Sequence, residues 1–316
     1  MILQTNISFT KETYNPITYD SKVCLLGSCF SEHIGGKLGY YKFNTFQNPL
    51  GILFHPKAIE NLILRAINQD EFTEKDIFFL NERWHCFEAH SDLSHADATT
   101  FLSNLNTAIQ KKHTFLQEAT HIIITLGTAW TYRHIETDTT VANCHKVPQK
   151  KFLKELLSVD EISGSIENCI ALLKNSNPKI TILFTVSPVR HLKDGFVENQ
   201  QSKAYLLAGI HHVVDARNQT HYFPSYELMM DELRDYRFYA EDMIHPNAIA
   251  IQYIWEKFQL AWISHESEKT LEEIATIQKG LAHKPFNPNS EAHQAFLAKL
   301  HAKIEKLQQQ FPAIKF

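Results

Sequence analysis

Apolar runs of strand length alternate with helical patterns along most of the chain. Three continuously apolar segments, each bounded by turn residues, predict strands over 22–26, 121–126 and 179–186. Runs of this kind are typical of strands buried on both faces of a parallel sheet. Apolar positions at helical spacing predict intervening helices over 30–39, 57–68, 96–117, 160–175 and 199–215, and another helix after His245. The alternation indicates an α/β fold with helices on both faces of a parallel sheet.

Two stretches depart from this alternation. The segment 72–94 is rich in aromatic residues and predicts a small antiparallel excursion at the rim of the sheet. From residue 264 onward, two amphipathic helices flank a proline-containing break at 284–290, where Asn289 or Ser290 is a suitable N-cap. The pattern therefore predicts one domain over 1–263 and a helical hairpin over 264–316. The hairpin either packs against the domain or serves as an arm through which the protein forms a homodimer.

Composition excludes several classes of protein. The chain carries 31 Lys and Arg against 35 Asp and Glu, without a basic stripe, so we expect neither a nucleic-acid nor a membrane partner. The five cysteines are odd in number and show no Cys-x-x-Cys spacing, which is typical of reduced thiols. The first six residues lack the pattern of a secretory signal, and we expect a soluble, cytoplasmic protein.

A serine stands where the first predicted strand turns into a helix, in Gly27-Ser28-Cys29-Phe30. A hydroxyl there lies at the carboxyl end of a sheet strand, where open α/β sheets bind ligands. The serine amide lies at a helix N-terminus, which favours a developing oxyanion. Ser28 is therefore the candidate nucleophile, although it could simply cap the helix. Cys29 competes with it, and we expect Ser31 to be a surface residue.

An acid–base couple follows much later in the chain. Asp242 and His245 are three residues apart on one predicted loop, so the carboxylate can orient the imidazole without help from elsewhere. The alternative is a surface aspartate and a capping histidine, because the chain contains 18 histidines. The order Ser28, Asp242, His245 favours a catalytic triad.

These residues resemble a known family. Gly27-Ser28-Cys29-Phe30-Ser31 is similar to the signature that names the GSCFA family, a branch of the SGNH/GDSL hydrolases. Further segments that resemble this family lie at 48–52, 125–130, 143–148, 187–191 and 236–242. The resemblance covers about residues 24–258 and leaves the C-terminal helices outside it. It implies a flavodoxin-like three-layer α/β/α sandwich, with an SGNH-like hydrolase domain over 1–263.

The same resemblance implies residue roles. Ser28 matches the nucleophile, Asp242 and His245 match the acid–base couple, and the amide of Gly51 would join that of Ser28 in the oxyanion hole. One position departs, because Ala129 stands where typical SGNH enzymes have an asparagine that donates to the oxyanion. Losing such a donor typically costs about 2.7–4 kcal/mol of transition-state stabilisation. Two residues could replace it, Asn143 and Thr128, and both could instead be structural.

Other polar side chains are candidates for substrate contact. They are His90, His145 and Arg190, the last followed by His191 just beyond a predicted strand, although Arg190 could instead hold loops together. We expect no cofactor, and the spacing of His85, His90 and His95 does not indicate a metal site. The expected function is ester hydrolysis through an acyl-serine, with carbohydrate O-acetyl groups as the substrate class by analogy. The alternatives are O-acyl transfer and a non-catalytic carbohydrate-binding module.

Overall fold

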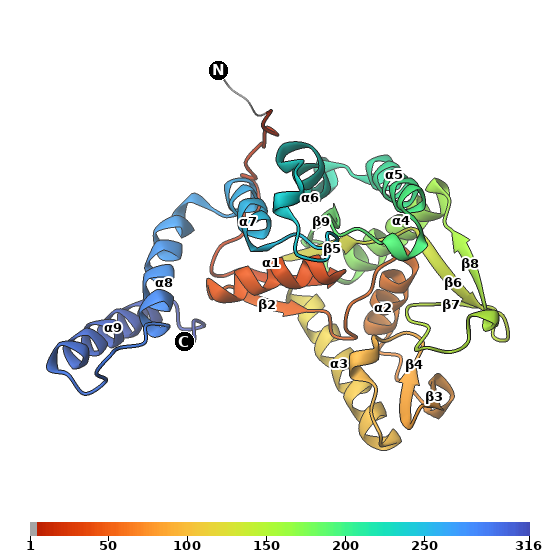
Figure 1. Ribbon diagram of the computed structural model, residues 1–316, viewed down its shortest axis with the longest axis horizontal. Coiled ribbons are helices and arrows are strands. Elements are labelled where there is room, and N and C mark those ends of the chain that lie inside the picture. Colours follow the sequence, from red (N-terminus) through yellow and green to blue (C-terminus); the bar gives the residue numbers. More distant parts are fainter. Residues whose placement is uncertain (1–4) are drawn as a thin grey trace.

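A five-stranded parallel sheet forms the centre of the computed structural model, which describes residues 5–316 (Figure 1). Its strands are β1 (Lys22–Gly27), β2 (Asn44–Gln47), β5 (His121–Leu126), β9 (Thr181–Val186) and β10 (Thr220–Tyr222). They lie in the spatial order β10-β9-β5-β1-β2, and each neighbouring pair is parallel. This is the flavodoxin-like doubly wound order, with the sequence direction reversing beside β1.

The central strands are buried on both faces, as their continuous apolar runs predicted. In β1, Cys24 and Leu26 point into one apolar cluster, and Val23 and Leu25 point into the other. This alternation follows from the two-residue repeat of a strand. Every residue of β5 and β9 is buried.

Helices cover the two faces. α1 (Cys29–Tyr40) and α7 (Ala248–Trp262) pack on the face of Val23 and Leu25. The opposite face is covered by four helices: α2 (Pro56–Asn68), α3 (Ala98–Glu118), α4 (Val159–Ser176) and α5 (Phe196–Val213). The predicted three-layer α/β/α architecture is therefore confirmed, and the predicted strands and helices lie within three residues of the observed ones.

Antiparallel excursions extend the rim of the sheet. The predicted one is the hairpin of β3 (Ile77–Leu80) and β4 (Arg83–Cys86). A second, which the sequence pattern did not reveal, contains β6 (Trp130–His134), β7 (Thr139–Val141) and β8 (Phe152–Leu156). After β10 the chain forms a short helix, α6 (Ser225–Glu227), and a π-helical segment over Leu228–Leu233.

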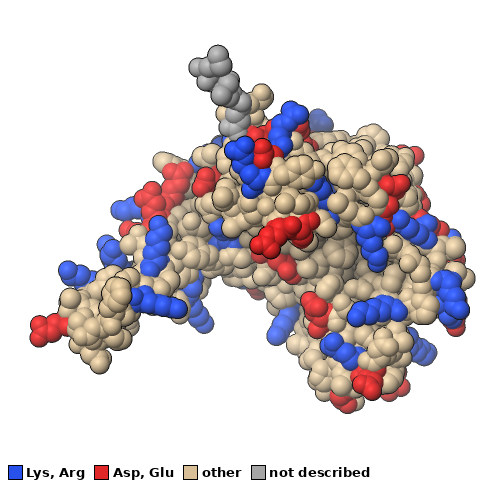
Figure 2. Space-filling model, in the orientation of Figure 1, with Lys and Arg blue, Asp and Glu red and all other residues tan. Residues whose placement is uncertain are grey.

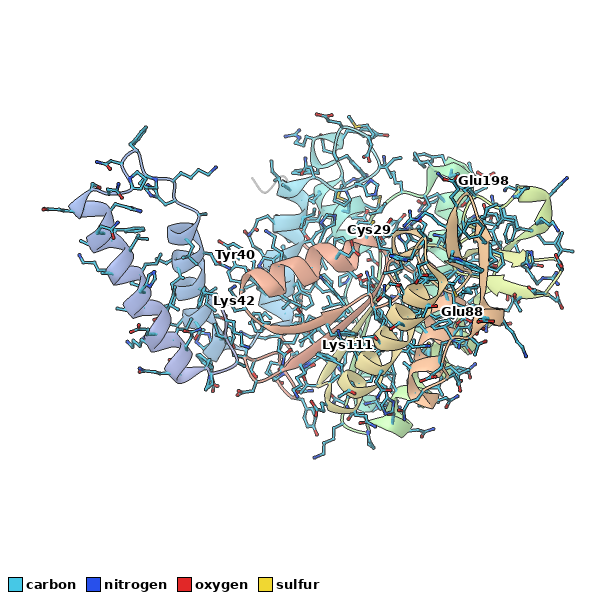
Figure 3. All side chains as sticks on the ribbon, turned by 90° about the horizontal axis from the view of Figure 1, so that it is seen from below. Cys29, Tyr40, Lys42, Glu88, Lys111 and Glu198 are labelled. Carbon is cyan, nitrogen blue, oxygen red and sulfur yellow. The ribbon has the colours of Figure 1, made fainter. Side chains whose placement is uncertain are left out.

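The C-terminal hairpin consists of α8 (Glu268–Leu281) and α9 (Glu291–Gln310), with Ser290 as the N-cap of α9. Ile274 and Leu300 join the apolar cluster under α1, and Gln278 Nε2 donates to Tyr40 O at 2.9 Å. Figure 3 shows the hairpin near Tyr40, at the opposite end of α1 from Cys29. It therefore lies away from the Ser28 turn, and dimerisation through it stays a prediction.

One face of the molecule carries charges of both signs (Figure 2), and the cysteines are not paired. Basic and acidic side chains are interspersed over the face shown in Figure 2. All five cysteines are free, and Cys24, Cys86 and Cys169 are buried. Among residues 5–316, no helix combines the length and the apolarity that crossing a bilayer requires. The first four residues, part of the segment in which we expect no signal, lie outside the described residues.

Candidate active site

Ser28 lies at the tight turn between β1 and α1. Gly27 precedes it with a φ of 127°, and a methyl group on Gly27 would overlap the carbonyl oxygen of Thr125. Only glycine fits this position, because it combines a left-handed backbone with close contact to a neighbouring strand. The Ser28 hydroxyl accepts the Phe30 amide at 3.3 Å. Ser28 is thus the N-cap of α1, as the structural alternative predicted, and it stands at the carboxyl edge of the sheet.

Hydrogen bonds of the Asn48 and Ser31 side chains stabilise this turn. Asn48 Oδ1 accepts the Gly27 amide at 3.0 Å, and Asn48 Nδ2 donates to Ser31 Oγ at 3.1 Å. Ser31 Oγ in turn donates to Ser28 O at 2.7 Å. The prediction of Ser31 as a surface residue is wrong, because the side chain is buried in this network. Sequence reasoning included Asn48 in a family segment but missed its role.

The Ser28 side chain is enclosed. Its exposed fraction is 0%, and among the described residues it makes no hydrogen bond to the His245 ring. The competing nucleophile Cys29 is partly buried, and burial, with the charge of Glu32, raises the pKa of its thiol. A protonated thiol is a weak nucleophile, so the environment favours Ser28 over Cys29.

Asp242 and His245 form the expected couple. His245 Nδ1 donates to Asp242 Oδ2 at 2.6 Å, which leaves Nε2 as the nitrogen that can accept a proton. Asp242 Oδ1 accepts the amides of Ile244 and His245 at 2.9 and 3.0 Å. These bonds to the backbone and ring of His245 and to Ile244 lower the pKa of Asp242 to about 2. The carboxylate therefore stays ionised at neutral pH and orients the imidazole.

Arg190 holds this loop against the end of β9. Its amide donates to Ile244 O at 3.2 Å, and its guanidinium donates to Met243 O at 3.4 Å. The guanidinium also lies 4.1 Å from the centre of the Tyr239 ring. Of the two roles considered for Arg190, these contacts correspond to holding loops together, and substrate contact stays a prediction.

His245 interacts electrostatically with two histidines near the nucleophile turn. Its positive form contributes, after burial, to lowering the pKa values of both His33 and His191. His33 lies on the second turn of α1. His191 contacts Gly127 next to Ser28: a methyl group added at Gly127 would lie 3.0 Å from His191 Nε2 and 3.4 Å from Ser28 Cβ. His191 therefore lies close to the Ser28 turn, and the placement of His245 next to Ser28 stays a prediction.

The expected oxyanion donors have partners within the protein. The Ser28 amide donates to Thr125 O at 3.1 Å, and the Gly51 amide donates to Asn48 O at 2.8 Å. Thr128 Oγ1 accepts the Trp130 amide at 3.0 Å and lies 3.1 Å from Ser202 Oγ. Asn143 Oδ1 accepts the His145 amide at 2.9 Å. A preformed pair of unoccupied backbone amides is therefore not present at Ser28 and Gly51.

The two histidine candidates lie at different places. His90 packs directly on Gly51, where its Cβ would overlap any added methyl group, and its ring accepts the Asp92 amide at 3.4 Å. His145 is buried, and its Nε2 donates to Cys86 O at 2.6 Å. Burial lowers the pKa of His145 to about 4. Both make structural contacts, and only His145 lines the adjacent cavity.

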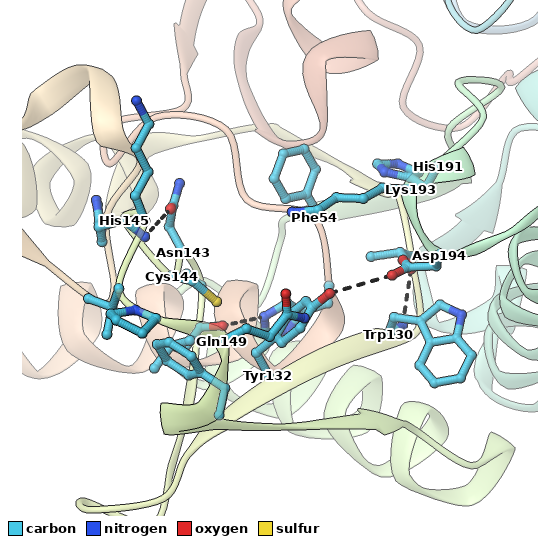
Figure 4. Close-up of a pocket in the computed structure, with 18 residues that line it drawn as sticks. Phe54, Trp130, Tyr132, Asn143, Cys144, His145, Gln149, His191, Lys193 and Asp194 are labelled. Carbon is cyan, nitrogen blue, oxygen red and sulfur yellow. Dashed lines mark hydrogen bonds between the residues drawn. The ribbon is translucent and has the colours of Figure 1, made fainter.

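That cavity has a volume of about 660 Å³ and lies between the carboxyl edge of the sheet and the β6-β7-β8 excursion (Figure 4). Aromatic rings and polar side chains both line it, among them Phe54, Trp130, Tyr132, Asn143, Gln149, His191, Lys193 and Asp194. Phe54 and His191 meet edge to face at 5.5 Å, and both also contact the Gly127 position. They therefore connect the lining of the cavity with the Gly127 position, which Ser28 also contacts.

A fully buried lysine underlies the site and was missed by sequence reasoning. Lys203 Nζ donates to Gly127 O and to Ser187 O, both at 2.7 Å, and so joins the ends of β5 and β9. Its exposed fraction is 1%, and burial lowers its pKa to about 7. Lys203 forms no ion pair with any acidic residue in the described part of the chain. Its position in the middle of α5 gave no sequence signal, because lysine is common on exposed helix faces.

Comparison with known proteins identifies the family. The model of the GSCFA family matches residues 22–258, and a model described as GSCFA domain protein, C-terminal domain, matches residues 274–316. The chain therefore belongs to the GSCFA family. The second match corrects the expectation that the C-terminal helices lie outside the resemblance.

Other comparisons add little. No curated protein matches the chain. Among solved structures, a carbohydrate esterase family 3 protein from Talaromyces cellulolyticus is similar, with a TM-score of 0.36 and 10% identity. That similarity covers 81% of this chain and 99% of the other. Similarity this distant assigns no activity.

Proposed function

We propose that this protein is a serine hydrolase that cleaves ester bonds through an acyl-serine, with Ser28 as nucleophile. The observation that carries the proposal is the Asp242–His245 couple, whose carboxylate and imidazole are joined at 2.6 Å. The resemblance to SGNH hydrolases and the membership of the GSCFA family support the same chemistry.

The reaction follows from the residues. His245 Nε2 takes the proton of Ser28 Oγ while Oγ attacks the ester carbonyl, and Asp242 stabilises the imidazolium. The imidazolium then protonates the departing alcohol, which leaves an acyl-serine. Water, deprotonated by His245, attacks the acyl carbon and releases the acid with Ser28 restored. In the structure the Ser28 hydroxyl faces the Phe30 amide, so the first step includes its rotation toward His245.

The cavity fits the alcohol part of the ester better than the acyl part. A space of about 660 Å³ is far larger than an acetyl group needs and lies within the range typical of ligand sites. Its mixture of aromatic rings with amide, ammonium and carboxylate groups suits a polyhydroxylated ligand. We therefore propose O-acylated carbohydrates as the substrate class.

Active-site labelling tests the nucleophile. A fluorophosphonate probe should form an adduct on Ser28, and p-nitrophenyl acetate should be hydrolysed. Ser28→Ala should abolish both, and Cys29→Ala is the matched control that should leave labelling in place. If labelling persists in Ser28→Ala, or if it is lost in Cys29→Ala, Ser28 is not the nucleophile.

The enclosure of Ser28 favours a second candidate, O-acyl transfer. A nucleophile with an exposed fraction of 0% is shielded from bulk water, and acyl transfer to a hydroxyl acceptor requires such shielding. Product analysis with an acetylated donor and a sugar acceptor separates the two: only free acid, whatever the acceptor concentration, excludes transfer. A non-catalytic binding module, the third alternative, is excluded by p-nitrophenyl acetate turnover that His245→Ala abolishes.

A further inference from the structure

The oxyanion hole lacks a side-chain donor at Ala129. This residue is fully buried, and its amide donates to Ser202 Oγ at 2.7 Å. A methyl side chain cannot donate to an oxyanion, so a donor must come from another element if the proposed ester chemistry is efficient.

The two residues proposed from sequence are poorly placed for that role. The Thr128 hydroxyl is engaged by Ser202 and by the Trp130 amide. The Asn143 backbone donates to Phe87 O at 3.2 Å, which ties this loop to the β3-β4 excursion. Figure 4 shows Asn143 and His191 on opposite sides of the cavity, with His191 beside Phe54.

His191 occupies the position next to the nucleophile. A methyl group added at Gly127 would lie 3.0 Å from His191 Nε2 and 3.4 Å from the Ser28 Cβ, so both atoms border the same small space. A reacting carbonyl attacked by Ser28 Oγ would fill this neighbourhood. Among the buried polar side-chain atoms of the described residues, His191 Nε2 is one without a hydrogen-bond partner. Buried polar groups without a partner are costly, and a site that stabilises developing charge is a place where they are retained.

The histidine is held in this place by contacts that do not use Nε2. Asn199 Oδ1, buried at the start of α5, accepts the His191 amide at 2.8 Å. The Phe54 ring contacts the imidazole edge to face at 5.5 Å. A donor fixed before the reaction needs no reorganisation when charge develops, which is the condition for efficient oxyanion stabilisation.

Protonation separates a donor role from a base role. Burial, with the charges of Lys203 and His245, lowers the pKa of His191 to about 3. The imidazole is therefore neutral at working pH and a weak base, whereas a neutral ring with its proton on Nε2 can still donate a hydrogen bond. Among the described residues no carboxylate pairs with the His191 ring, in contrast to the pairing of His245 with Asp242.

We propose that His191 is a further catalytic residue, whose Nε2–H donates to the oxyanion formed when Ser28 attacks the ester carbonyl. This inference rests on the proposed function. In the absence of the SGNH asparagine, the histidine that follows Arg190 supplies the side-chain donor from the end of β9 instead of from the end of β5.

Three variants at this position test the donor. His191→Phe keeps the aromatic contact with Phe54 and removes the donor, and it should lower kcat on p-nitrophenyl acetate by roughly 10²–10³-fold with KM within about twofold. His191→Gln places an amide near the former Nε2 and should recover most of the lost rate. His191→Ala should lose as much as His191→Phe. The variants Thr128→Val and Asn143→Ala alter the two donors proposed from sequence, and each should lower kcat far less than His191→Phe does.

A transition-state analogue distinguishes catalysis from packing. Phenylboronic acid forms a tetrahedral adduct on a nucleophilic serine, so its affinity should fall in His191→Phe by about the same factor as kcat. If His191→Phe keeps kcat and boronate affinity within threefold, or if Asn143→Ala or Thr128→Val carries the loss, the inference is wrong. If His191→Phe does not fold, the boronate affinities of His191→Gln and His191→Ala are compared instead. A clearly higher affinity in His191→Gln supports the donor role, and equal affinities refute it. Wild-type protein without Ser28-dependent turnover would instead refute the proposed function.

Discussion

Replacing Lys203 by methionine should change how stability depends on pH. Lys203 is enclosed under the site, and its ammonium donates to Gly127 O and Ser187 O without an ion pair to a described acidic residue. Burial lowers its pKa from 10.5 to about 7, so the native state releases this proton at lower pH than the unfolded chain does. Stability from this group is therefore fully present above pH 10.5 and is lost as the pH falls toward 7.

The magnitude follows from these two pKa values. Keeping Lys203 charged in the native state costs about 5 kcal/mol relative to the neutral form. The variant Lys203→Met removes this cost but also leaves two buried carbonyl groups without a donor, at about 1–3 kcal/mol each. These terms oppose each other, so the diagnostic quantity is the change with pH. Between about pH 7.5 and about pH 9.5 the wild type should gain about 2–3 kcal/mol relative to Lys203→Met.

Urea unfolding followed by tryptophan fluorescence at both pH values measures this difference. Comparison of the two proteins cancels the groups that they share. Lys111→Met is the matched control, because Lys111 is exposed on α3 and its replacement should leave the pH dependence parallel to that of the wild type. A gap between wild type and Lys203→Met that stays within about 0.5 kcal/mol across this range would refute the argument that Lys203 is desolvated.

Three further predictions concern the triad and its turn. Asp242→Asn should lower kcat roughly 10²–10⁴-fold with KM little changed, because the amide no longer fixes the His245 tautomer; an unchanged kcat would contradict the couple. His245→Gln should lower kcat at least as far as Asp242→Asn, because glutamine has no basic nitrogen that can accept the Ser28 proton; retained activity would argue against a histidine base. Gly27→Ala should destabilise the fold by about 2–4 kcal/mol in urea unfolding, because its methyl group meets the Thr125 carbonyl; a change under about 0.5 kcal/mol would show that the turn adapts.

Strongly periodic segments could be predicted with confidence from the sequence, and short edge elements could not. The strand over 121–126 was predicted with its observed bounds, because its apolar run is continuous and framed by turn residues. By contrast, β2 and β10 are short edge strands with exposed or half-buried positions, and their composition resembles that of loops. The β6-β7-β8 excursion was missed because its side chains mix aromatic, charged and polar residues without a clean alternation.

The candidate site likewise contains residues that the sequence could predict and residues that it could not. Ser28, Asp242 and His245 could be proposed from local chemistry, since a glycine-serine turn and an Asp-x-x-His loop are both short-range patterns. The role of Lys203 could not be predicted, because its burial depends on how α5 packs against the ends of β5 and β9. His191 was only a candidate for substrate contact, since its nearness to Ser28 depends on how the end of β9 lies beside that of β5.

The sequence by itself determined the class of fold, the family signature and the candidate residues for ester chemistry, because these depend on patterns within a few neighbouring residues. The tertiary structure alone decided that Ser28 is enclosed, that the Ser28 and Gly51 amides have internal partners, and that His191 and Ser28 both contact the Gly127 position. These are properties of distances and burial between segments far apart in the chain. Such properties exist only once the parallel strands have brought their carboxyl ends together at one edge of the sheet.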